Sequence, residues 1–185
     1  MSAILAADTS RPVDRYRLPA VALHWLIALL ILGMLCLGYY MTDIPKGTPE
    51  RAFYFNLHKS FGILAAVLIL VRLGWRLSNV VPPLPGSMAA WQASAARLNH
   101  RLLYVCMVLM PATGYISSSF NKFGIKFFGL QLPNWGWEDK YLRELFVDFH
   151  HAIAVLFVTL IVIHVLAALK HAFVDHDQVF RRMLP

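Results

Sequence analysis

The sequence predicts an all-α integral membrane protein, a four-helix bundle with both termini in the cytoplasm. Hydrophobic residues make up 58% of the 185 residues and charged residues only 15%, which is too apolar for an ordinary soluble domain. The apolar residues form four stretches, each close to the ~20 residues that cross about 30 Å of hydrocarbon. We therefore expect one domain over residues 1–185, with helices at about 18–41, 50–77, 88–119 and 140–171.

The helix boundaries carry recognisable signals. The first apolar stretch, 18–41, is longer than the apolar part of a cleavable export signal and lacks its small-residue ending, so we expect a retained helix. The second helix has Thr48 as a predicted N-cap, followed by Pro49 and Glu50, which suit a first turn. In the third helix Pro111 predicts a kink, because proline lacks an amide hydrogen.

The basic residues predict the orientation of the bundle. Ten of the 17 lie before helix one, between helices two and three, or after helix four, and these regions share one side if the helices alternate. An excess of Lys and Arg marks the cytoplasmic side. The net charge of +7 does not indicate nucleic acid, since these residues lie at helix ends rather than on an aromatic-interleaved soluble face. The ten are Arg11, Arg15, Arg17, Arg72, Arg76, Arg97, Arg101, Lys170, Arg181 and Arg182.

Four histidines fall inside the apolar stretches. His150 and His164 are 14 residues apart. At about 100° per residue, the rotation between the two positions is roughly 40° short of four full turns. The two side chains therefore share one helix face and are separated by about 21 Å along the axis. Following the direction of each helix, His24 lies near the inner, cytoplasmic side and His58 near the outer side. The depths predict two pairs, His24 with His164 and His58 with His150.

Two facing imidazoles at each of two depths are what bis-histidine ligation of two haems requires. No CxxCH motif is present, so the haems would be b-type and non-covalent. Alternatives are packing histidines, a zinc site and a proton-coupled transporter. Zinc normally adds Cys or carboxylate ligands, which the helix interiors lack, and no span contains the Asp or Glu expected of a transporter. Cys36 and Cys106 match no metal motif and are expected to be lipid-facing or core residues.

The other histidines have open assignments. His151 would replace His150 as the outer ligand if the helix were rotated. His100, at the inner start of helix three, would contact a quinone or a haem propionate, or be a plain interfacial residue. His171 is expected at the surface, and we assign no role to His176.

Cations and glycines near these histidines also have two interpretations. Arg72, Arg76 and Arg101 at the inner side, and Lys59 at the outer side, could bind haem propionates, since arginine suits carboxylates. The three arginines could equally be topology anchors, and Lys59 could instead attract an anion. Glycines in helices one and two could leave room for a flat macrocycle or serve close helix packing. These glycines are Gly33, Gly38 and Gly62.

Five segments together resemble the bacterial cytochrome b561 family, over about Arg15 to Pro185. They are ALHW, NLHKSFG, VRLGWRL, FHHAIA and IHVLAAL. The resemblance implies a multi-pass inner-membrane cytochrome with two b haems, which passes electrons between a quinone and another redox partner. It also implies His24, His58, His150 and His164 as axial ligands. The doubled histidine in FHHAIA departs from the single histidine followed by Glu that is expected there.

Three functions follow from these observations. The leading expectation, implied by the resemblance, is oxidation of superoxide at the periplasmic side with reduction of ubiquinone. The second is a haem-carrying membrane anchor or electron conduit that serves a dehydrogenase or hydrogenase. The third is a haem-free transporter or structural bundle. In each case membrane lipid surrounds the chain, and no nucleic acid is expected as a partner.

Overall fold

Four long helices dominate the structure, a computed structural model that describes residues 15–84 and 88–184. They are α1 (Leu18–Asp43), α2 (Pro49–Ser78), α3 (Ala90–Ser119) and α4 (Lys140–Phe173). Each is long and apolar enough to cross a membrane, which confirms the predicted all-α membrane fold. The bounds lie within two residues of the expected ranges. Arg11 and Pro185 fall outside the described residues.

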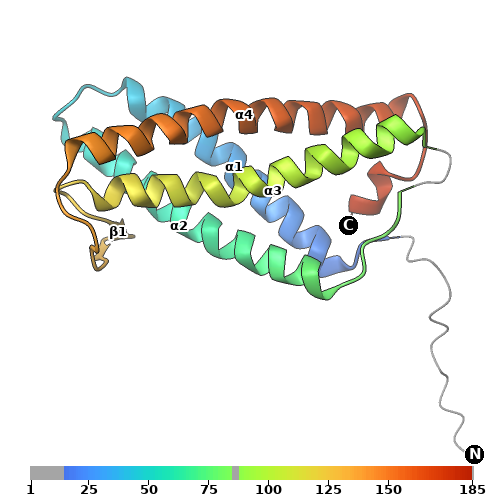
Figure 1. Cartoon of the computed structure of the whole chain (residues 1–185), viewed down its shortest axis with the longest axis horizontal. Helices are drawn as coiled ribbons and strands as arrows, with labels where there is room; N and C mark the ends of the chain where they lie inside the picture. The colour runs from blue at the N-terminus through green and yellow to red at the C-terminus, as the bar shows by residue number, and fades with distance from the viewer. Residues whose placement is uncertain (1–14, 85–87, 185) are drawn as a thin grey trace, which may run out of the picture.

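The bundle consists of two helix pairs. Helix α1 packs against α2 and α3 packs against α4, while α2 also contacts α3 (Figure 1). Helix α4 approaches α1 and α2 much less closely. The start of α1, the end of α2, the start of α3 and the end of α4 share one end of the bundle, which we call the inner end. The opposite end is called the outer end.

Local signals place the helix starts. The Thr48 hydroxyl accepts a hydrogen bond of 3.2 Å from the Arg51 amide, so the predicted cap of α2 is confirmed. Asp139 caps α4 in the same way, accepting from Leu142 N at 3.0 Å. Pro111 lies inside α3 and removes the amide that would bond one turn back.

The buried core lies at mid-height in the bundle and draws on all four helices. Ile27, Ile69, Met107 and Phe157 contribute one large side chain from each. Cys106 belongs to the same cluster and is only 2% exposed, which confirms a core position, whereas Cys36 is exposed. Many other apolar side chains on the outside of the bundle are exposed, as expected of surfaces that face lipid.

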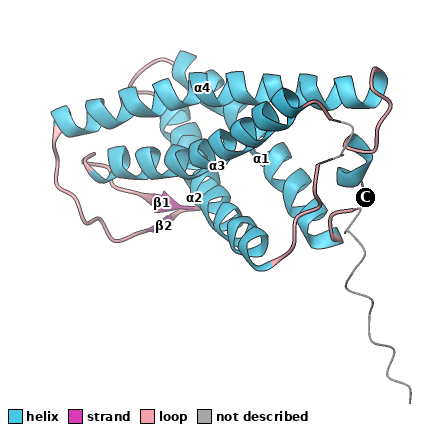
Figure 2. Ribbon diagram, turned by 45° about the vertical axis from the view of Figure 1, so that its right-hand side comes forward, coloured by secondary structure: helices cyan, strands magenta, loops and turns pink. Residues whose placement is uncertain are grey.

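The loop between α3 and α4 contains a small hairpin that the sequence did not predict. Strands β1 (Lys126–Phe127) and β2 (Leu130–Gln131) pair antiparallel and lie beside α2 (Figure 2). Both turn residues, Phe128 and Gly129, have positive φ, at 45° and 93°. A Phe in that conformation is unfavourable, and the turn lacks the usual Asn-Gly signal. Bonds to α2, described below, hold it in place.

The chain after α4 folds back against the inner end of the bundle (Figure 1). It includes the short 3-10 helix η1 (Phe180–Met183). The Trp25 indole donates to the Met183 carbonyl at 2.7 Å, and Arg182 donates to the Pro83 carbonyl at 2.5 Å. These bonds tie the tail to α1, next to His24, and to the segment that links α2 and α3.

Candidate functional site

The structure brings together one histidine pair at the outer end. His58 of α2 and His150 of α4 have ring centres 6.4 Å apart, with ring planes at 79°. Both side chains are half-buried. Since α2 and α4 otherwise approach loosely, these rings span the gap between the two helix pairs.

Helix α3 fixes the orientation of His150. Nδ1 of His150 lies 3.0 Å from the Met110 carbonyl and 3.1 Å from the Thr113 hydroxyl. The hydrogen of that hydroxyl is donated to the Leu109 carbonyl at 2.8 Å. A carbonyl can only accept, so Nδ1 carries the hydrogen and Nε2 keeps a free lone pair. Metal-binding histidines are commonly held in this way. Thr113 was not predicted, although its position two residues after a helix proline is a usable signal.

Two glycines let neighbouring helices approach the outer rings. A Cβ built on Gly38 of α1 would lie 3.3 Å from Cε1 of His58, and one on Gly114 of α3 would lie 3.3 Å from Cε1 of His150. Such contacts are tighter than ordinary van der Waals packing. Each imidazole therefore rests on a glycine of the helix paired with its own. Gly38 was among the glycines singled out in the sequence, and Gly114 was not.

The hairpin forms a cover beside the outer pair. Lys59, next to His58, donates to the Gly124 carbonyl at 3.2 Å. Ser60, only 2% exposed, accepts a hydrogen bond from Phe128 N at 2.9 Å. Its own hydrogen reaches the Asn56 carbonyl at 2.8 Å, and the Lys126 carbonyl lies 3.3 Å away. The Lys59 ammonium is thus held against the loop between α3 and α4, at the outer end of the bundle. Ser60 was missed from the sequence because it reads as a packing residue.

A second cluster lies toward the inner end and contains three histidines. His24 of α1 and His164 of α4 have ring centres 6.2 Å apart at 69°. His100 of α3 lies 5.4 Å from His164, with planes at 65°. His100 is therefore part of the inner cluster rather than an isolated interfacial residue.

Among the predicted inner cations, only Arg72 touches a paired histidine. Its Nη1 donates to the Ala20 carbonyl at 2.8 Å, and its Nη2 lies 3.4 Å from Nδ1 of His24. A guanidinium can only donate, so His24 Nδ1 accepts here. Arg76 instead lies over the Tyr104 ring, 5.2 Å from its centre, and Arg101 is exposed.

The two adjacent histidines of α4 lie in different surroundings. His150 faces His58 across the bundle, while His151 is exposed. The rotated arrangement that would exchange them is not the one found.

Ring spacing tests whether each pair suits a metal between its imidazoles. Two metal–nitrogen bonds of about 2 Å, added to the distance from each nitrogen to its ring centre, come to roughly 6 Å. The separations of 6.2 and 6.4 Å fit this value, whereas 5.4 Å for His100 and His164 is short. Within the described residues, Nδ1 of His58 is buried without a hydrogen-bond partner. The geometry fits bis-imidazole ligation at two levels.

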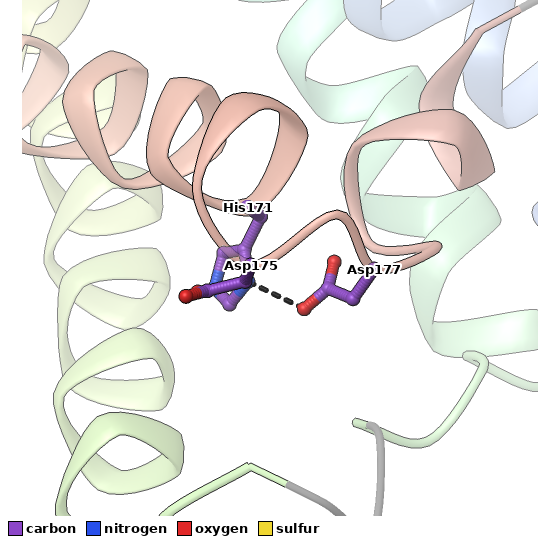
Figure 3. Close-up of side chains that lie close together, drawn as sticks. All are labelled: His171, Asp175 and Asp177. Carbon is purple, nitrogen blue, oxygen red and sulfur yellow. Dashed lines mark hydrogen bonds and ion pairs between the residues drawn. The ribbon is translucent and has the colours of Figure 1, made fainter.

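A different cluster of ligand-type side chains closes the inner end of α4. His171, Asp175 and Asp177 have ligand atoms within 4.8 Å of one another (Figure 3). His171 Nδ1 lies 2.6 Å from Asp177, and Lys170 contacts Asp175 at 2.5 Å, a hydrogen bond that lowers the pKa of that carboxyl. Lys170 thus compensates the charge of Asp175, and His171 contacts Asp177. The His171 side chain is 15% exposed, because the returning tail packs against it.

Comparisons with known proteins agree with this arrangement. The profile of the prokaryotic cytochrome b561 family matches residues 15–185. The chain is 33% identical over 181 residues to cytochrome b561 homolog 2 of Escherichia coli K12, covering 92% of each chain. It is 26% identical to cytochrome b561 homolog 1 of the same strain, over 94% of this chain and 98% of that one. It is 24% identical to a probable superoxide oxidase, CybB, of Yersinia pestis, over 92% and 96%. The chain therefore belongs to the prokaryotic cytochrome b561 family, the multi-pass inner-membrane proteins that bind b-type haem and transfer electrons.

Proposed function

We propose that the chain holds two non-covalent b-type haems, one between His58 and His150 and one between His24 and His164. The observation that carries this proposal is the repeated ring separation, 6.4 and 6.2 Å, at two levels of one bundle. His150 is already oriented with its free Nε2 lone pair available. The apolar core containing Ile27 and Phe157 lies between the two levels and excludes water there.

The inner ligand His24 needs one local change. An iron-bound imidazole offers its unprotonated nitrogen to the metal, whereas here that nitrogen faces Arg72. Binding would release the guanidinium, which then suits a propionate. Arg72 is therefore our candidate for the inner propionate, ahead of Arg76, which lies over Tyr104, and Arg101, which is exposed. At the outer end Lys59 remains the candidate cation.

We further propose that the protein oxidises superoxide at the outer, periplasmic side and reduces ubiquinone. Two superoxide anions give two O₂ and two electrons, and ubiquinone takes up those electrons with two protons to give ubiquinol. Bound haem supplies a one-electron carrier at each level. The relative named as a probable superoxide oxidase, at 24% identity, supports this direction of electron flow. The excess of basic residues at the inner end supports cytoplasmic termini and a periplasmic outer end.

The chain's own groups would act at each end. Lys59 provides a positive charge near the outer pair, and a fixed cation raises the local concentration of an anion such as superoxide. His100 contacts the inner cluster but stands outside the ligand pair. We assign it to contact with the ubiquinone ring, since an imidazole can donate a hydrogen bond to a quinone carbonyl.

Purified holoprotein exposed to an enzymatic source of superoxide provides the test. We expect the reduced haem spectrum to develop, superoxide dismutase to abolish it, and added ubiquinone to reoxidise the haem. Absence of haem reduction would refute superoxide oxidation. Co-purification of a dehydrogenase subunit that reduces the haems would then favour the conduit function instead.

Glycine packing around the outer pair gives a separate prediction for haem binding. Gly114→Leu should displace the His150 ring, because even a Cβ there would lie 3.3 Å from Cε1, and should remove most of the outer haem. Haem per chain and the visible spectrum are the measurements. Gly74→Leu, in α2, is the control, since its Cβ would meet nothing within 4 Å. Equal haem loss in both variants would contradict the assigned role of Gly114.

A further inference from the structure

A basic pocket opens at the inner end, between the start of α1, the end of α2 and Tyr104 of α3. It has about 410 Å³ of empty space, including its open mouth. Its polar and aromatic lining includes Arg17, Arg72, Arg76, Asn79, Trp75 and Tyr104. Among the described residues, no Asp or Glu lines it. Three guanidinium groups thus line one pocket, and the part of its wall that the structure describes contains no carboxylate.

Two of these arginines have donors to spare. Among the described residues, Arg17 makes one long side-chain contact, 3.4 Å from Nη1 to the Asn79 side-chain oxygen. Arg76 lies over the Tyr104 ring and, among the described residues, forms no ion pair. Each guanidinium has five N–H donors, so most of theirs remain available to an anion.

Arg72, the third arginine, lies deeper in the bundle than Arg76 and has different hydrogen-bond partners. Arg72 precedes Arg76 by one helical turn, about 6 Å further into the bundle. It already contacts the Ala20 carbonyl and His24. Arg72 therefore contacts the inner histidine cluster directly, while Arg17 and Arg76 lie nearer the mouth of the pocket, at the membrane boundary.

The residues around the pocket opening favour binding of an amphiphilic anion over a small soluble anion. Val80, which lines the pocket, is 80% exposed, and nearby Leu77 is 79% exposed. Trp75 and Tyr104 are of the residue types that favour the headgroup level of a bilayer. Basic pockets between helices at this level suit acidic lipid headgroups. We propose that Arg17 and Arg76 bind the phosphate of an anionic phospholipid, whose acyl chains lie along the exposed apolar end of α2.

Binding of phosphatidylglycerol to the purified holoprotein tests this site, with phosphatidylcholine in the same mixed micelles as the neutral comparison. Native mass spectrometry would count bound lipid per chain. Arg17→Gln and Arg76→Gln should each weaken phosphatidylglycerol binding about fivefold, and the double variant by roughly 20-fold. Arg97→Gln, at an exposed position near the start of α3 and outside the pocket, should leave binding unchanged. An unchanged haem spectrum would show that each variant is folded.

Three results would overturn the proposal. Loss of binding in Arg97→Gln equal to that in Arg76→Gln would indicate general surface charge. Inorganic phosphate that displaces the lipid at equal concentration would indicate a site for free phosphate rather than a headgroup. A lower haem content with unchanged lipid binding would assign these arginines to a propionate. None of these results depends on whether superoxide is the electron donor.

Discussion

His150→Ala is expected to remove the outer haem and leave the inner one, lowering bound haem by about half. The substitution deletes the imidazole that α3 orients through Met110 and Thr113, and His58 has no second ring at that level. A haem with one axial ligand in a bundle built for two is held weakly. The loss should appear as a reduced haem-to-protein ratio and as the disappearance of one component of the reduced α-band.

His151→Ala is the matched control, because it removes a neighbouring imidazole that is exposed and does not face His58. We expect full haem content and an unchanged spectrum. The opposite pattern, with haem lost in His151→Ala and kept in His150→Ala, would mean that the helix binds haem in the rotated arrangement. Loss of all haem in both variants would indicate general misfolding, and then His58→Ala becomes the deciding variant.

The spans could be read directly from the sequence, because hydrocarbon requires long apolar segments whose backbone bonds are internal. Depth followed from the direction of each helix, so the pairing of His24 with His164 and of His58 with His150 needed only residue counts. The structure brings these same rings together. Their ligation of haem remains a prediction.

The supporting contacts could not be predicted, since depth does not specify how a helix is rotated or which neighbour it faces. The Met110 carbonyl that receives the His150 hydrogen is a backbone group and carries no sequence signal. In the sequence, Gly114 cannot be distinguished from other helix-packing glycines, because its closeness to the His150 ring is visible only in the structure. For the same reason His100 could be placed at the inner side, but not in contact with His164.

Tertiary contacts also decide two features that the sequence did not predict, the hairpin and the covering of His171. The hairpin depends on Ser60, which is far away in sequence and stabilises a turn containing Phe128 at positive φ. His171 is covered because the tail returns to Trp25 and carries Asp177 with it. Neither interaction leaves a local pattern in the sequence.

His164→Ala is expected to remove the inner haem and to abolish ubiquinone reduction. His164 is the ring that contacts both other imidazoles, His24 at 6.2 Å and His100 at 5.4 Å. Its loss leaves His24 beside Arg72 without a ring at ligating distance. Outer haem should remain and still be reduced by superoxide, so the variant would accept electrons that it cannot pass on. Haem per chain and stopped-flow reduction followed by ubiquinol assay would separate these steps.

His100→Ala distinguishes ligation from substrate contact within the same cluster. If His100 contacts ubiquinone, this variant keeps both haems and their spectra but reduces ubiquinone about tenfold more slowly, the effect of one lost hydrogen bond. If His100 is itself an axial ligand, inner haem falls in His100→Ala and persists in His24→Ala. That second result would contradict the pairing inferred from the ring separations, because it would require the 5.4 Å pair rather than the 6.2 Å pair to bind the metal.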